Sequence, residues 1–205
     1  MAFGRSKLLT MHINKIKNVL QSFVVFPMFA MTMPLASLDA VGSMTASIEA
    51  ITSEVSVITT QENEARKAKA DAIDNYFASK DAPLSGYGMK FVTEAEKNNL
   101  DWRLLPAIAM RETTGGKFAC KNPNAPYNNF GWHSCKKGFS SIEESIEFIS
   151  MTLGGNNEKG RYYKEGMTSE QILKKYNPDS VIPGYSKQVM KIMDTIGGFK
   201  KDNNI

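Results

Sequence analysis

A glutamate on an apolar helical stripe is the residue of this sequence whose position best fits acid chemistry. The stretch 101–117 predicts a short helix in which Leu105, Ile108, Ala109 and Glu112 fall at i, i+3, i+4 and i+7. The stripe that faces the core therefore also carries a carboxyl group. Partial burial and the negative end of the helix dipole both disfavour the anion, so we expect the pKa of Glu112 to be raised. A carboxyl group with a raised pKa can act as a general acid near neutral pH.

The signals at both ends of this helix place Glu112 in its last turn. Asp101 is the predicted N-cap, and the run of two threonines followed by Gly115 and Gly116 predicts the stop. The two glycines also remove side-chain bulk where a polymeric ligand would approach the acid. A plainer interpretation is that Glu112 reaches past the stripe and bonds Lys117 at the helix end.

The segment 118–139 follows without helical or strand periodicity and is too long for an idle connection. Its aromatic residues alternate with amides and a glycine: Tyr127, Asn128, Asn129, Phe130, Gly131 and Trp132. Flat apolar rings beside amide donors suit sugar faces and N-acetyl groups, so this loop is a candidate wall of a carbohydrate cleft. The alternative is a small core around a disulfide, and both interpretations can hold together.

The two cysteines of the chain, Cys120 and Cys135, lie within this loop. In an exported protein they predict a disulfide that contributes roughly 3 kcal/mol, whereas in the cytosol free thiols are the better interpretation. With His133 as the nearest further ligand, the ligand count and spacing do not suit a closed zinc site. We expect no metal and no cofactor.

The N-terminal residues 1–40 have the pattern of an export signal. Basic residues without an acid occupy positions 1–17, a mostly apolar stretch follows over 18–36, and small residues come next. A cleaved signal peptide and an uncleaved membrane anchor fit equally well, and a cytosolic amphipathic helix is a weaker third interpretation. Either of the first two predicts a secreted or membrane-anchored protein that acts outside the cytoplasm.

Residues 41–80 predict a long helical stalk. Apolar residues alternate at steps of three and four: Val41, Met44, Ile48, Ile51, Val55 and Ile58. Such a heptad seam indicates a coiled coil through which the chain could self-associate. A single amphipathic helix lying on its own domain explains the pattern equally well. A cluster of Pro, Ser and Gly at 80–88 then predicts the boundary of a compact domain over 82–205.

The remainder of that domain predicts helices only. One is expected over 89–99, one behind a capping box at Ser140 and Glu143, one from Thr168 to Tyr176, and a last one from Tyr185. The predicted fold class is therefore mainly α. The net charge of +4 over 205 residues is too weak to indicate a nucleic-acid partner.

Four segments in order resemble the glucosaminidase family of lysozyme-like enzymes, which includes bacterial mannosyl-glycoprotein endo-beta-N-acetylglucosaminidases. They are LDWRLLPAIAMRETTGGK, NNFGW between the cysteines, YYKEGMTSEQILKKYNPDS and PGYSKQVMKIM. The resemblance covers about residues 84–196 and leaves out the N-terminal region. It implies a lysozyme-like helical fold and hydrolysis of β-1,4 bonds in peptidoglycan or a related N-acetylglucosamine polymer, outside the cytoplasm and facing the cell wall.

The resemblance also implies roles for individual residues. Glu112 falls on the family's general acid, and Thr113 stands where the family usually has serine. The expected substrate-binding residues are Thr113, Asn129, Phe130, Gly131, Trp132, Tyr176 and Asn177, the last two beside the scissile bond.

The second catalytic group is left open by the sequence. Asp179 is the best candidate for a second carboxylate, although an aspartate that caps a turn is the commoner explanation. The N-acetyl oxygen of the substrate or Tyr176 are alternatives. Related enzymes with one glutamate form an anhydro sugar, so a lytic transglycosylase or muramidase is an alternative activity. A wall-binding module without catalysis is a third hypothesis.

Overall fold

The computed structural model describes the backbone of residues 39–157 and 162–199, and the side chains of 54–157 and 162–199. The predicted signal peptide or anchor lies almost wholly outside these residues and stays a prediction. In the part that is described, no helix is long and apolar enough to cross a membrane. The chain divides into two units, residues 1–50 and 51–205.

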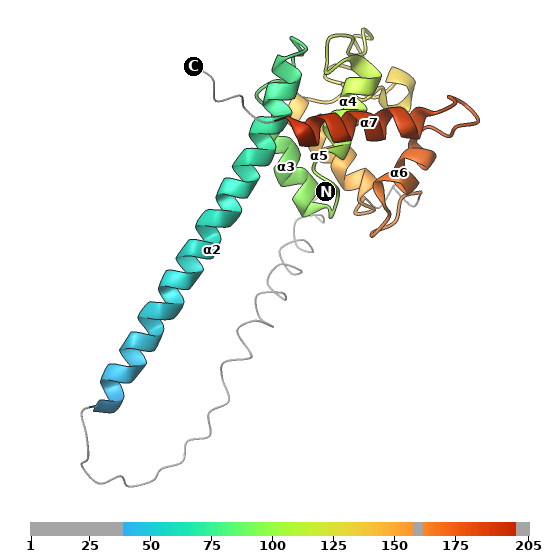
Figure 1. Ribbon diagram of the computed structural model, residues 1–205. Coiled ribbons are helices and arrows are strands. Elements are labelled where there is room, and N and C mark those ends of the chain that lie inside the picture. Colours follow the sequence, from blue (N-terminus) through green and yellow to red (C-terminus); the bar gives the residue numbers. More distant parts are fainter. Residues whose placement is uncertain (1–38, 158–161, 200–205) are drawn as a thin grey trace, which may run out of the picture. The chain divides into compact units, whose positions relative to one another are not determined.

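The described residues form helices and no strand, which confirms the predicted mainly α class. The α-helices are α2 (Asp39–Ala78), α3 (Gly88–Lys97), α4 (Leu104–Thr113), α5 (Ile142–Leu153), α6 (Ser169–Tyr176) and α7 (Tyr185–Gly198). A short 3-10 segment, η2 (Trp132–Cys135), interrupts the long loop between α4 and α5 (Figure 1).

The core lies among α3 to α7. Helix α4 packs chiefly on α7, α3 packs on α5, and α6 packs on α7. The apolar stripes predicted for α5 and α7 point into this core, with Ile146, Ile149 and Leu153 fully buried on α5 and Val189 and Ile196 on α7. Helix α4 is buried through most of its length, which fixes the position of its last turn and of Glu112.

The end of α2 is part of the same core. The predicted stalk extends to residue 80, but Ile73 and Phe77 are fully buried in the core cluster with Leu84. Their spacing of four residues puts them on one helical face, and Phe77 contacts Phe91 of α3 with ring centroids 5.9 Å apart. Nearer the N-terminal end of α2, the side chains of Val55 and Ile58 are each 56% exposed. The compact domain therefore includes residues that the heptad pattern assigns to the stalk.

Asp101 is not the N-cap of α4. The helix begins at Leu104 with Arg103 in the cap position. The Asp101 carboxylate instead accepts hydrogen bonds from the backbone N–H of Arg103 (2.9 Å) and from its guanidinium group (3.0 and 2.7 Å). These contacts and the Arg103 guanidinium hold the pKa of Asp101 below its usual value despite partial burial.

The predicted capping box at Ser140 and Glu143 is wrong, because Ser141 is the N-cap of α5 and the reciprocal bond of a box is not made. Ser141 caps the helix by accepting from the backbone N–H of Glu144 at 3.1 Å, while the Ser140 hydroxyl donates to the Glu144 carboxylate at 2.6 Å. The predicted box at the start of α6 is confirmed, since Thr168 and Gln171 bond each other reciprocally. That box fixes the start of the helix that ends at Tyr176.

Candidate functional site

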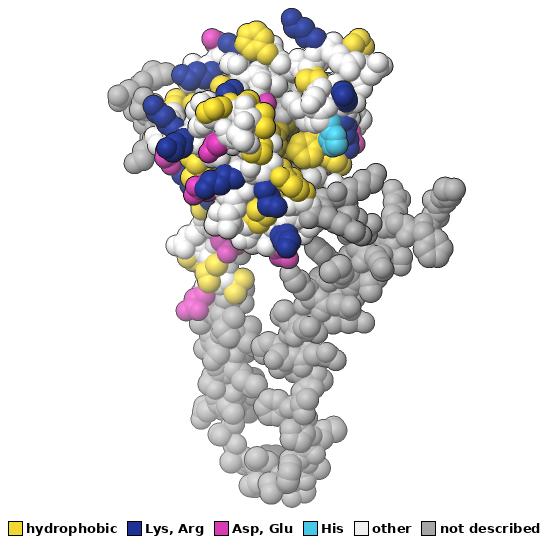
Figure 2. All heavy atoms as spheres, turned by 90° about the vertical axis from the view of Figure 1, so that its right-hand side faces the viewer, with side chains coloured by type: hydrophobic (Ala, Val, Ile, Leu, Met, Phe, Trp, Pro, Cys, Tyr) yellow, Lys and Arg dark blue, Asp and Glu magenta, His cyan; other side chains and the backbone are white. Residues whose placement is uncertain are grey.

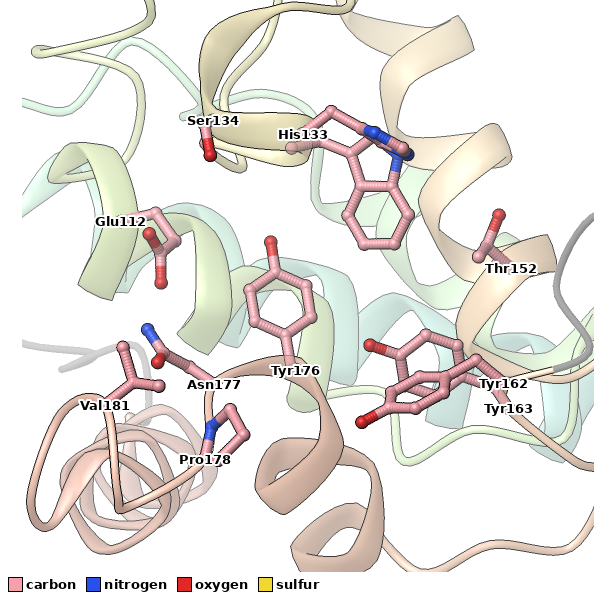
Figure 3. A pocket seen from close by; sticks show the side chains of 12 residues that line it. Glu112, His133, Ser134, Thr152, Tyr162, Tyr163, Tyr176, Asn177, Pro178 and Val181 are labelled. Atoms are coloured by element: carbon pink, nitrogen blue, oxygen red, sulfur yellow. The ribbon is translucent and has the colours of Figure 1, made fainter.

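A pocket of about 660 Å³ opens beside the last turn of α4. It is lined by Glu112, Gly131, Trp132, His133, Ser134, Thr152, Tyr162, Tyr163, Tyr176, Asn177, Pro178 and Val181 (Figure 3). Glu112 is the one carboxylate among these described lining residues, and they include no lysine or arginine. Elsewhere on the surface, Figure 2 shows Lys and Arg side chains dispersed over the face in view, with acidic side chains among them. Glu112 thus lies in a pocket whose described lining has four Trp or Tyr rings and no other Asp, Glu, Lys or Arg.

Glu112 lies in the last turn of α4, as predicted. The helix ends at Thr113, and Thr114 adopts a left-handed conformation with φ of 52°. Gly115 follows at φ of 63°, where a Cβ atom would lie 2.6 Å from the Ala82 side chain and 2.9 Å from that of Phe77. A residue with a side chain cannot occupy this position without displacing the core.

Tyr185 is the hydrogen-bond partner of Glu112. The Tyr185 hydroxyl donates to Oε1 of Glu112 at 2.6 Å, although the two residues are 73 positions apart in the sequence. The alternative partner Lys117 is therefore wrong: its side chain is exposed, and the acid bonds a buried tyrosine of α7. Tyr185 fixes the orientation of the carboxyl group in the pocket.

The pKa of Glu112 is raised, which confirms the direction expected from the sequence. Partial burial is the main cause, because it disfavours the charged form. The hydrogen bond from Tyr185 and the nearby positive charge of Arg111 act in the opposite direction and lower the pKa by less. The carboxyl group therefore keeps its proton to a higher pH than an exposed glutamate does.

Tyr176 and Tyr185 form a stacked pair of rings, and Tyr185 bonds the acid. Their rings are nearly parallel, at 7° and with centroids 6.2 Å apart. The Tyr176 hydroxyl donates to the carbonyl oxygen of Phe130 at 2.6 Å. Burial raises the pKa of both phenols well above their ordinary value, and the charge of Glu112 raises it further. Both hydroxyls are therefore neutral donors at any physiological pH.

Residues 131–135, here called the pocket wall, face this tyrosine pair from the loop. Gly131 has φ of 62°, and a Cβ atom there would lie 3.1 Å from Oε2 of Glu112. Glycine therefore allows the wall to approach the acid closely. Asn128, which is fully buried, holds the start of the wall: its Oδ1 accepts from the backbone N–H of Trp132 at 2.9 Å, and its Nδ2 donates to the Trp132 carbonyl at 2.9 Å.

Trp132 presents its ring to the pocket in contact with other aromatic residues. Its ring centroid lies 5.8 Å from that of Tyr176 and 6.4 Å from that of Phe148 on α5. The indole N–H is buried and has no hydrogen-bond partner among the described residues. The ring is thus held by packing rather than by a polar contact.

The structure gives three predicted substrate-binding residues a supporting position. Oγ1 of Thr113 lies 2.7 Å from the Asn129 carbonyl oxygen and accepts from the backbone N–H of Gly116 at 3.0 Å. Thr113, Asn129 and Phe130 are buried and do not line the pocket. They tie the end of α4 to the pocket wall, so they position Glu112 and Gly131. Of the predicted set, Gly131, Trp132, Tyr176 and Asn177 do line the pocket.

Asp179 is not brought to the acid. Its side chain is exposed and does not line the pocket, although its neighbours Asn177 and Pro178 do. The described lining thus offers no second carboxylate facing Glu112. In the part of the chain that is described, no cluster of three or more His, Cys, Asp or Glu side chains is arranged to hold a metal ion.

Several lining residues are not singled out by the sequence. Tyr162 and Tyr163 supply aromatic surface at the end of the pocket near Thr152 of α5. The adjacent tyrosine pair is the signal that could have identified them. From its sequence position, Tyr185 is expected to be an ordinary core residue of α7, because its bond to Glu112 is formed only by tertiary packing. Comparisons of the chain with protein-family models, with curated proteins and with solved structures found no match.

Proposed function

We propose that this chain is a glycosidase that cleaves β-1,4 bonds in the glycan strands of peptidoglycan, as an endo-β-N-acetylglucosaminidase with a lysozyme-like helical domain. The observation that carries the proposal is a carboxyl group of raised pKa in a pocket whose described lining has several aromatic rings and no other Asp, Glu, Lys or Arg. A raised carboxyl pKa in a concave site is typical of a general acid. The resemblance of residues 84–196 to glucosaminidases supports the same assignment.

Glu112 supplies the proton for bond cleavage. The carboxyl proton passes to the glycosidic oxygen as the bond from that oxygen to the anomeric carbon breaks, and positive charge develops on the sugar. Glu112 becomes a carboxylate, and the hydrogen bond from Tyr185 at 2.6 Å stabilises this anion. Tyr185 thus orients the acid before the transfer and stabilises its conjugate base afterwards.

The lining suits N-acetylated sugars. Trp132 and Tyr162 offer flat apolar surface for sugar faces, and Asn177 offers an amide for hydroxyl or N-acetyl groups. The absence of Lys and Arg from the described lining fits an uncharged segment of polymer rather than a phosphate or a uronic acid. The substrate class is therefore a glycan rich in N-acetylglucosamine.

The second catalytic group is supplied by the substrate in this proposal. Glycosidases commonly use two carboxylates, but the described lining contains one. The N-acetyl oxygen of the sugar can attack its own anomeric carbon as the bond to the leaving group breaks. Water then attacks the anomeric carbon and breaks its bond to the N-acetyl oxygen, and a proton of this water returns to the Glu112 carboxylate. Tyr176 is less suited to the same role, because its hydroxyl is already bonded to the Phe130 carbonyl.

The single carboxylate also favours a second candidate, a lytic transglycosylase. In that reaction Glu112 first donates a proton to the leaving oxygen. As a base, it then takes a proton from a hydroxyl of the same sugar, which closes an anhydro ring. The two reactions differ only in the group that attacks the anomeric carbon. Their products therefore separate them.

The predicted location agrees with a wall substrate. The export pattern of residues 1–40 predicts a domain outside the cytoplasm, either secreted or membrane-anchored. The Cys120–Cys135 disulfide, which the structure confirms, is typical of such compartments. The exposed apolar residues Val55 and Ile58 of α2 are consistent with a stalk that self-associates.

Product analysis tests the proposal. The full chain is incubated with purified peptidoglycan, and the fragments are identified by mass spectrometry beside those of Glu112→Gln. We expect reducing N-acetylglucosamine ends from the wild type and almost none from the variant. Anhydro ends would establish the transglycosylase instead. Intact strands after incubation with the wild type would contradict both enzymes and leave the wall-binding hypothesis.

A further inference from the structure

The pocket wall contains three consecutive residues in an unfavourable backbone conformation. His133, Ser134 and Cys135 have φ values of 51°, 52° and 60°. Residues with a Cβ atom rarely adopt this left-handed region, and a run of such residues does not persist without outside constraints. The contacts that hold residues 133–135 in this conformation therefore determine the shape of this side of the pocket.

Hydrogen bonds hold the two ends of the run. The Nδ2 group of Asn128 donates to the carbonyl oxygen of Trp132 at 2.9 Å and to that of Lys137 at 2.8 Å. The backbone N–H of Lys136 donates to the His133 carbonyl at 3.1 Å. These contacts define where the run begins and ends, but they leave the Ser134 backbone without an anchor of its own.

The Cys120–Cys135 disulfide fixes the run from the outside. It joins Cys135 to a segment that is itself anchored, because the backbone N–H of Cys120 donates to the Asn128 carbonyl at 3.3 Å. One further contact supports the same point: Asn122 donates to the Cys135 carbonyl at 3.1 Å. Both cysteines are only partly buried, so a small thiol can reach the bond.

Ser134 presents a free hydroxyl to the pocket. The residue is exposed, lines the pocket, and makes no side-chain hydrogen bond within the described part of the chain. Figure 3 shows its hydroxyl directed towards the space between Glu112 and Tyr176. A hydroxyl in this position can donate to or accept from a bound sugar beside the bond that Glu112 protonates.

We propose that Ser134 is a ligand-binding residue of this pocket and that the Cys120–Cys135 disulfide positions it. The inference rests on the proposed glycan-cleaving function and adds a binding group and a covalent requirement to it. Reduction by a dithiol adds two electrons and two protons to the sulfurs of Cys120 and Cys135, while the dithiol closes to its cyclic disulfide. The run then relaxes towards ordinary backbone conformations, and the hydroxyl leaves the pocket.

Glu112 and Tyr176 are held independently of the disulfide. Phe130 is buried in the core and bonded through its carbonyl to Tyr176, and Glu112 is held by Tyr185. Reduction should therefore change the wall and leave the helices and the acid in place. This separates a local positioning role from a general loss of the fold.

The test compares the oxidised full chain with its dithiothreitol-reduced form and with the Cys120→Ser/Cys135→Ser variant. The probe is a soluble tetramer of N-acetylglucosamine, and its Kd is measured by calorimetry. We expect at least tenfold weaker binding to the reduced chain and to the double variant. Ser134→Ala in the oxidised chain should weaken binding threefold to tenfold. Ser180→Ala, which replaces an exposed serine outside the pocket, should not change Kd.

Nuclear magnetic resonance provides a readout that does not require cleavage. The chain has two tryptophans: Trp132 in the wall, and Trp102, which lines a separate hollow with Phe199. On reduction, the amide signals of His133 and Ser134 and the indole signal of Trp132 should shift, while the Trp102 signal should not. A core variant of comparable stability loss, Ile196→Ala, should bind the tetramer as the wild type does.

The outcomes distinguish this inference from the proposed function. Tetramer binding that stays within twofold after reduction, with unchanged wall signals, overturns the inference and leaves the function standing. An oxidised chain that binds no tetramer overturns the proposed function together with the role of Ser134. In that case the amide signals of His133 and Ser134 and the indole signal of Trp132, compared before and after reduction, show whether the disulfide positions residues 133–135.

Discussion

The floor of the pocket and the pocket wall differ in what holds their side chains in place. The floor consists of Glu112 and Tyr176 together with Tyr185, which is buried and bonds Glu112. These residues lie at the ends of α4, α6 and α7 and are fixed by core packing and part-buried hydrogen bonds. The wall, residues 131–135, is a loop in which all residues except Trp132 have positive φ, and it is held by Asn128 and a disulfide.

This difference suggests a division of labour. A general acid needs a fixed position and a controlled pKa, and both come from the buried floor. A wall built from a loop can change its shape while the acid stays in place, so it suits ligand recognition. Changes to the floor should therefore act on the chemical step, and changes to the wall on binding.

Removal of the acid should have the largest effect. Glu112→Gln keeps the size of the side chain and an oxygen for the Tyr185 hydroxyl, but it cannot donate the proton. We expect kcat on peptidoglycan to fall by about 10² to 10⁴-fold with KM nearly unchanged. Glu143→Gln, in the exposed first turn of α5, is the matched control and should retain full activity. Equal rates for Glu112→Gln and the wild type would remove the acid from the mechanism.

The close approach of Gly131 in the wall to Glu112 in the floor can be disturbed by adding a single methyl group. In Gly131→Ala the added Cβ lies 3.1 Å from Oε2 of Glu112, so it should displace the acid and reduce kcat/KM by roughly tenfold to a hundredfold. Gly166→Ala is the control, because Gly166 also has positive φ, at 78°, but its Cβ would contact nothing within 4 Å. Similar activity loss in both variants would mean that backbone strain, rather than contact with the acid, is the cause.

Loss of the disulfide should lower stability more than it affects the acid. We expect Cys120→Ser/Cys135→Ser to reduce the free energy of unfolding by roughly 3 kcal/mol, because the unfolded chain is no longer constrained. Urea unfolding followed by circular dichroism measures this change. The pH at which activity falls on the alkaline side should stay where it is in the wild type. A shift of the alkaline limb of the pH–activity profile in the double variant would show that the disulfide in the wall affects the pKa of Glu112 in the floor.

Removal of the Tyr185 hydroxyl should change the pKa of Glu112 in a known direction. The hydrogen bond stabilises the carboxylate and lowers its pKa, so Tyr185→Phe should raise the pKa further and move the alkaline limb of kcat/KM to higher pH. The loss of one hydrogen bond in the transition state should reduce the rate at neutral pH by about threefold to tenfold. Tyr87→Phe, outside the pocket, should leave the profile unchanged.

The smallest effect is expected in the pH dependence of stability. Because burial raises the pKa of Glu112 in the folded state, the folded chain binds more protons than the unfolded chain between the two pKa values. The contribution of this group to stability is therefore full below the unfolded pKa and is lost as pH rises through the folded pKa. Thermal unfolding should show a smaller decline over this window for Glu112→Gln than for the wild type. Parallel curves would contradict the burial of the charge.

Much of the helical fold can be predicted from periodicity and capping, because both are local. The box at Thr168 and Gln171 and the buried stripe of α5 are confirmed. The N-cap of α4 is not, because Asp101 bonds Arg103 instead. The end of α2 joins the core through Ile73 and Phe77, and the turn-rich segment after it does not separate two domains.

The candidate site is less predictable, because its contacts join distant parts of the chain. The position of Glu112 and the direction of its pKa follow from one helix. Its bond to Tyr185 spans 73 residues and has no local signal. Polar residues beside a motif also satisfy nearby backbone groups, which is why Thr113 and Asn129 support the site without lining it.

The titration of the Glu112 carboxyl group in the full chain tests the central claim most directly. Carbon-13 resonance of the side-chain carboxyl, assigned by its absence in Glu112→Gln, gives the pKa. We predict a value above that of an ordinary glutamate, coinciding with the alkaline limb of kcat/KM on peptidoglycan. A pKa at or below the ordinary value, or an alkaline limb that does not follow it, would contradict the assignment of Glu112 as the acid.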